Sequence, residues 1–77
     1  MTTNSENSKK YFEEIKTFVA RATEVLKTRP TCFMYNMIHK EVIQHFRNAE
    51  SADCEFAIYR ELVAIKVWMK RLEAGIF

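Results

Sequence analysis

Residues 51–75 read SADCEFAIYRELVAIKVWMKRLEAG, and this stretch decides the fold. Its apolar side chains recur at steps of four, three, four and three residues, which places them on one side of an α-helix. We call this set the core seam: Ile58, Leu62, Ile65, Met69 and Leu72. Ser51 is expected to cap the start of the helix, and Gly75 to follow its end near Ala74. The spacing therefore predicts a helix of about 22 residues, roughly 33 Å long at 1.5 Å per residue.

A second apolar set lies roughly opposite the core seam on the same predicted helix. We call it the apolar stripe: Phe56, Tyr59, Val63 and Val67. A helix that is apolar on two sides needs a partner on each side. If the stripe stayed exposed, it would form an apolar patch of several hundred Å², larger than most monomers tolerate. We therefore expect the stripe to lie in an intermolecular interface and the chain to form a homo-oligomer.

The residues before this segment predict two further amphipathic helices. The first runs from about Ser8 to Thr28, with Ser8 as its cap and Pro30 as its stop signal. The second begins after Thr31, which is expected to cap it, and ends near Asn48. Residues 1–7 contain few apolar side chains and are expected to form a disordered polar tail. The predicted organisation is this tail followed by a single three-helix domain over residues 8–77.

Composition supports an all-α fold and a small domain. The 77 residues are 48% hydrophobic, with one glycine and one proline, so a protein with many β-hairpins is not expected. The prediction is a three-helix bundle, or a helical hairpin with an additional N-terminal helix. The polar start of the chain and the absence of a long apolar run favour a cytoplasmic protein without a membrane span, or one in the host cytoplasm if the source is viral. Cys32 and Cys54 are expected to be packed thiols without a disulfide.

Side chains that could perform chemistry are few and poorly spaced. His39 and His45 are six residues apart, which is not the three- or four-residue spacing of a helical metal site. Glu41 is instead expected to pair with His45 on the surface, while His39 borders the core. Cys54 lies near a predicted helix start and is interpreted as a small packing residue. No enzyme activity, metal or cofactor is expected.

Two more residues, Phe33 and Met37, fall on the polar side of the second predicted helix and join the stripe as interface candidates. Aromatic and methionine side chains are enriched at protein interfaces. The function that this pattern favours is stoichiometric binding to a protein partner, as by a small inhibitor, an adaptor or a chaperone-like subunit.

A first alternative comes from a resemblance carried by Ser51, Asp53, Ala57, Ile58, Ala64 and Trp68. This segment is similar to the last helix of small phage proteins that sequester cyclic-oligonucleotide immune signals, although the tryptophan is one position out of register. The resemblance covers about a quarter of the chain. It implies a helical oligomer, without catalytic residues, that holds a cyclic nucleotide between subunits. Stacking would then involve Tyr11 or Trp68, and phosphate binding would draw on Lys9, Lys10, Lys66, Lys70 and Arg71.

A second alternative is a small protein that binds DNA or RNA. The candidate phosphate contacts are Arg60, Lys66, Lys70 and Arg71. A nucleic-acid binder normally concentrates basic residues more strongly than a chain with a net charge of +2 does. A steep loss of affinity with added salt would distinguish this function from the other two.

Overall fold

The computed structural model describes residues 6–75, and these form three α-helices. Helix α1 spans Glu6–Thr28, α2 spans Phe33–Glu50 and α3 spans Glu55–Ala74. No strand occurs within residues 6–75, so the prediction of an all-α fold is confirmed. Of the two predicted arrangements, the structure is the three-helix bundle, because each helix packs against both of the others.

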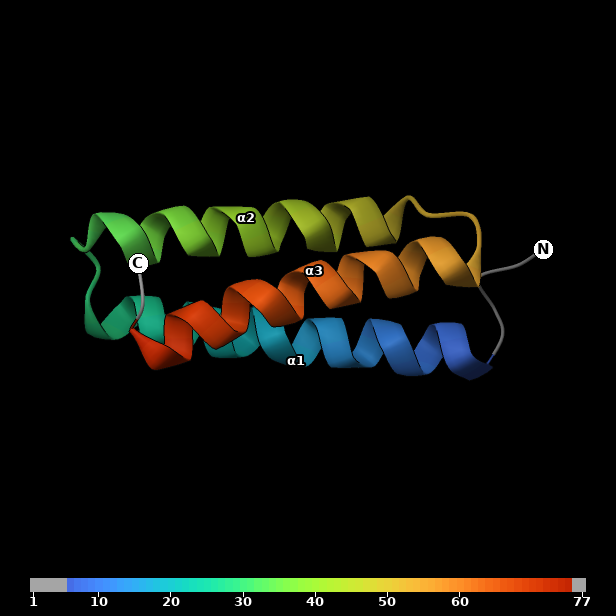
Figure 1. The fold of residues 1–77 in the computed structure, drawn as a ribbon, viewed down its shortest axis with the longest axis horizontal. Coiled ribbons are helices and arrows are strands. Elements are labelled where there is room, and N and C mark those ends of the chain that lie inside the picture. Colours follow the sequence, from blue (N-terminus) through green and yellow to red (C-terminus); the bar gives the residue numbers. More distant parts are fainter. Residues whose placement is uncertain (1–5, 76–77) are drawn as a thin grey trace.

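The helices run up, down and up, and α3 crosses obliquely over the pair formed by α1 and α2 (Figure 1). All five residues of the core seam point into the bundle and are at most 4% exposed. They meet a matching set of buried residues from the other two helices: Ile15, Ala22, Ile38, Val42 and Ala49. The core seam is therefore buried, as its spacing predicts, and α1 and α2 together cover it.

The turn between α1 and α2 follows the proline signal, with one correction. Helix α1 ends at Thr28 as predicted, but α2 is preceded by Cys32 rather than capped by Thr31. The Cys32 backbone N–H donates to the Arg29 carbonyl, which extends the turn by one residue. The Asn36 side-chain amide then donates to the carbonyls of Pro30 and Cys32 at 2.9 and 2.8 Å. A side chain inside α2 thus fixes the turn.

The connection between α2 and α3 differs from its prediction in a similar way. Ser51 does not begin α3; it closes α2, because its hydroxyl donates to the carbonyls of Arg47 and Asn48 at 3.3 and 3.2 Å. Helix α3 then begins at Glu55, with Cys54 at its N-cap. At the other end of α3 the prediction is confirmed, since Gly75 has a φ of 69° and its N–H donates to the Arg71 carbonyl.

Helix α1 also begins earlier than the sequence predicts. The helix begins at Glu6, so Glu6 and Asn7, which were assigned to the polar tail, are helical, and Ser8 is a buried helical residue rather than a cap. The added turn contacts α3, where the Asn7 side-chain amide donates to the Glu55 carboxylate at 3.4 Å. The rest of the predicted tail, residues 1–5, lies outside the described residues.

The two cysteines are free, as predicted. They precede α2 and α3, so the 18 residues of α2, about 27 Å at 1.5 Å per residue, separate them along the bundle. Disulfide geometry requires Cα atoms within about 7 Å, so this fold cannot join them within one chain. None of the helices described is both long enough and apolar enough to cross a lipid bilayer.

Candidate functional site

The apolar stripe lies on the outward side of α3. Its exposed fractions are 67% for Phe56, 43% for Tyr59, 42% for Val63 and 50% for Val67. The opposite side of α3 forms the core with α1 and α2, and all four stripe side chains remain exposed. The stripe is therefore a row of large apolar side chains facing solvent in the single chain.

One residue of the stripe, Tyr59, also contacts α1. The Tyr59 ring packs against the Tyr11 ring, with centroids 5.1 Å apart and planes tilted by 52°. Tyr11 itself is half-buried against the core. Tyr59 is therefore a shared residue, which belongs both to the contact between α1 and α3 and to the exposed stripe.

The two interface candidates on α2 behave differently from each other. Phe33 is 75% exposed, but Met37 is half-buried and packs against the core, so its assignment to the polar side of the helix is wrong. Its flexible side chain packs beside the buried core residues. Phe33 starts α2 at the end of the bundle where α3 finishes, whereas Phe56 is in the first turn of α3 (Figure 1). The structure therefore does not bring Phe33 and Phe56 together.

The acidic residues of α3 all contact the other two helices. Glu61 accepts a hydrogen bond from His45 of α2 at 2.7 Å. Glu73 pairs with Arg21 of α1 at 2.8 Å. Glu55 is half-buried and lies near Asn7, as described above. The outward side of α3 therefore has no carboxylate of its own.

The basic residues of α3 are distributed differently. Lys66 lies 3.9 Å from Glu14 of α1, and the Arg71 guanidinium lies over the Trp68 ring at 5.4 Å from its centroid. Arg60 and Lys70 are exposed, and neither makes an ion pair within the described part of the chain. The outward side of α3 thus combines apolar side chains with unpaired positive charge.

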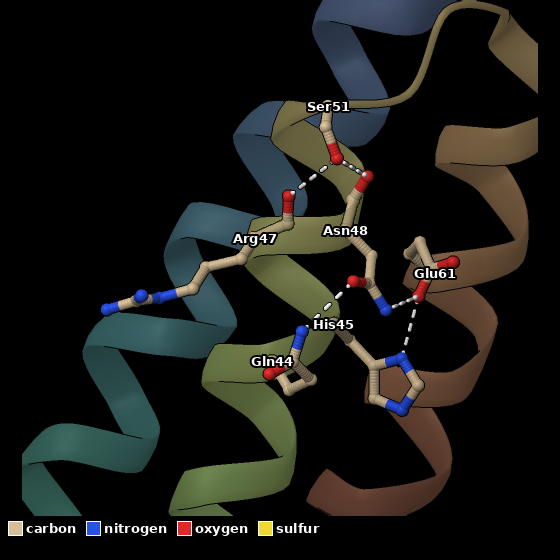
Figure 2. A network of polar contacts seen from close by, with 6 residues as sticks. All are labelled: Gln44, His45, Arg47, Asn48, Ser51 and Glu61. Carbon is tan, nitrogen blue, oxygen red and sulfur yellow. Dashed lines mark hydrogen bonds and ion pairs between the residues drawn. The ribbon is translucent and has the colours of Figure 1, made fainter.

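The polar contact between α2 and α3 corrects the sequence-based interpretation of the histidines. Figure 2 shows that the His45 ring faces Glu61, so the predicted pair between Glu41 and His45 is wrong. Glu61 precedes Leu62 of the core seam, and this register places its carboxylate at the α2 boundary. Because an ionised carboxylate only accepts hydrogen bonds, Nδ1 of His45 is the donor.

Two further polar contacts extend this region, and a third joins α2 to Thr23 of α1. Asn48 reaches the same Glu61 oxygen at 3.5 Å and accepts a hydrogen bond from Gln44 at 3.1 Å (Figure 2). His39 borders the core as predicted, with Nε2 3.1 Å from the Thr23 hydroxyl. No cluster of three or more potential metal ligands occurs in residues 6–75.

The residues proposed for nucleotide binding do not form one site within the chain. Tyr11 contacts the α1 side of α3 through Tyr59, whereas Trp68 lies nine positions further along α3, about 13 Å by helical rise, and on the opposite flank. The cations are split between these flanks, since Lys66 contacts α1 and Arg71 covers Trp68.

One surface feature had no counterpart in the sequence-based predictions. A shallow groove of about 560 Å³ lies where the start of α1 meets the connection between α2 and α3. Its walls include Lys9, Phe12, Ala49 and Ile58. The groove depends on how three chain segments meet, so no pattern in a single helix could have indicated it.

Comparison with known protein families, with curated proteins and with solved structures finds no match to this chain.

Proposed function

We propose that this protein is a non-enzymatic helical interaction protein that binds a protein partner stoichiometrically through the apolar stripe of α3. The observation that carries the proposal is the exposure of four large apolar side chains on one side of a helix whose other side already forms the core. Exposed apolar rows of this kind are typical of surfaces that bind another protein.

A partner that covered the stripe would stabilise the complex by burying apolar surface. Burial of apolar surface stabilises a protein or complex by about 25 cal/mol per Å². In the single chain the stripe side chains are only partly buried, so only part of this stabilisation is obtained. A partner helix that covered Phe56, Val63 and Val67 would add it without rearranging the bundle. Association through a preformed rigid helix also costs little conformational entropy.

The partner can be a second copy of this chain, as the sequence-based prediction has it, or a different protein. Sedimentation equilibrium at high micromolar concentration distinguishes the two, because only self-association raises the mass of the purified protein. The proposal ranks above nucleotide binding because the candidate cations are divided, with Lys66 beside Glu14 of α1 and Arg71 over the Trp68 ring on the other flank of α3. It ranks above nucleic-acid binding because apolar side chains separate the free cations Arg60 and Lys70.

A comparison of three proteins tests the proposal: the wild type, Val63→Glu and Ala20→Glu. Val63→Glu places a charge in the middle of the stripe, whereas Ala20→Glu places the same charge on an exposed position of α1. Each protein is immobilised and exposed to extract from the source cell, and the retained proteins are quantified. We expect a partner, which is this chain itself or another protein, to be retained by the wild type and by Ala20→Glu and lost from Val63→Glu. Equal retention by all three proteins would contradict the proposal.

A further inference from the structure

We infer that the partner of this surface is an amphipathic helix with acidic side chains, an inference that rests on the function proposed above. The outward side of α3 carries more than the stripe. Six of the exposed residues on this side follow steps of four, three, four, three and four, which is the spacing of a seam for helix packing. We call this set the outer seam: Phe56, Arg60, Val63, Val67, Lys70 and Ala74.

Two of the six outer-seam positions are positively charged. A helix packed along this seam would take Arg60 and Lys70 partly out of water, which is unfavourable unless opposite charges compensate. The two residues are ten positions apart, about 15 Å along the helix. A complementary partner helix therefore presents apolar side chains between two carboxylates that lie about 15 Å apart.

A second copy of this chain does not supply those carboxylates through the same seam. The acidic residues of α3 contact α1 and α2, as described above. In a parallel pairing of two outer seams, Arg60 and Lys70 would each face their own counterpart. In an antiparallel pairing centred on Val63, Lys70 would face Phe56, and Arg60 would lie beside Lys66. Both pairings place unpaired positive charge in the contact, so the charge pattern favours a different chain.

An anionic lipid surface would also offer negative charge, but the shape of the seam favours a helix. The apolar residues of the outer seam form a narrow row that Arg60 and Lys70 interrupt, whereas a helix that lies in a membrane interface has a broad, continuous apolar face.

The test uses two synthetic helical peptides, each about three heptads long, with leucine at the seam positions. The acidic peptide has glutamate at two seam positions ten residues apart, and the basic peptide has lysine there. Binding to the isotope-labelled protein is followed by the amide chemical shifts of α3. We expect the acidic peptide to bind at least about tenfold more tightly than the basic peptide. Arg60→Glu combined with Lys70→Glu should reverse this preference.

A matched control is available on the neighbouring helix. Lys40→Glu combined with Arg47→Glu makes the same change in net charge on exposed positions of α2, and Figure 2 shows the Arg47 side chain extending away from the polar contacts. This double variant should keep the preference of the wild type. The Val63→Glu protein should bind neither peptide.

Several outcomes would overturn the inference. If both peptides bind equally, or the basic peptide binds more tightly, and Val63→Glu abolishes both interactions, the surface binds helices but does not select acidic ones. The proposed function would then stand and this inference would fail. If neither peptide binds, while the wild type self-associates or binds phosphatidylserine vesicles, the acidic helix is the wrong partner. The extract experiment then decides the proposed function separately.

Discussion

The two sides of α3 are built from similar residues and have opposite environments. The core seam and the apolar stripe both follow helical spacing and both consist mainly of large apolar side chains. The core seam is enclosed by α1 and α2, whereas the stripe and the cations beside it face solvent. The comparison separates two roles within one helix: the inner side stabilises the fold, and the outer side is free to bind. Each prediction below tests this separation.

The largest expected effect on stability comes from the core seam. Leu62→Ala should lower the free energy of unfolding by about 2–5 kcal/mol, because it leaves a cavity in a closely packed interior. Val63→Ala, one residue further along the chain, should lower it by less than about 1 kcal/mol. Urea denaturation followed by circular dichroism measures both. Similar losses from the two variants would contradict the assignment of the two sides.

The polar contacts between α2 and α3 should contribute less to the free energy of unfolding than the core seam does. Glu61→Ala removes the acceptor that His45 contacts at 2.7 Å and should cost about 1–2 kcal/mol. Glu41→Ala, at the position that the sequence suggested as the histidine's partner, should change stability by no more than about 0.5 kcal/mol. A double-mutant cycle of His45 with Glu61 should show coupling, and a cycle of His45 with Glu41 should show none. The reverse result would mean that the packing register of α3 against α2 is wrong.

Polar replacement of the stripe should affect stability still less. A triple variant with serine in place of Phe56, Val63 and Val67 should keep its free energy of unfolding within about 1 kcal/mol of the wild type, because these side chains are exposed. Thermal melting at low protein concentration is the suitable measurement, since it avoids stabilisation by association. A decrease of several kcal/mol would place the stripe in the core.

A thiol reductant should not change the stability of the protein, because no disulfide joins the two cysteines. Cys32 and Cys54 are free and lie near opposite ends of the bundle, so the stability assigned to the core seam does not include a covalent link. The melting temperature with and without a thiol reductant should be the same. A decrease of more than about 10 °C would reveal a disulfide, whose loss typically costs 2–4 kcal/mol.

The presence of two apolar sides on α3 could be predicted from the sequence, because it depends on residue spacing within one helix. The steps between Ile58 and Leu72 predict a buried side, and those between Phe56 and Val67 predict a second apolar side. Gly75 is predictable for the same reason, since a left-handed residue after the last turn requires only local information.

The remaining features depend on contacts between helices. Ser51 can cap a helix start or close a helix end, and the choice follows from which carbonyls lie near its hydroxyl. His45 has carboxylates within reach in sequence at Glu41 and in space at Glu61, and only the register of α3 against α2 decides between them. The free charge of Arg60 and Lys70 could not be recognised either, because it depends on which acidic residues the other helices have already engaged.

The most direct test of this account compares Leu62→Glu with Val63→Glu, the same substitution at adjacent positions on opposite sides of α3. Leu62→Glu buries a charge among apolar side chains and should unfold the domain, with loss of the helical circular dichroism signal. Val63→Glu should retain the helical signal and unfold within about 1 kcal/mol of the wild type, because its side chain stays in solvent. The folded Val63→Glu protein should nevertheless fail to retain the partner that the wild type binds. If Val63→Glu unfolds like Leu62→Glu, or stays folded and still retains that partner, then the outer side of α3 is not the binding surface.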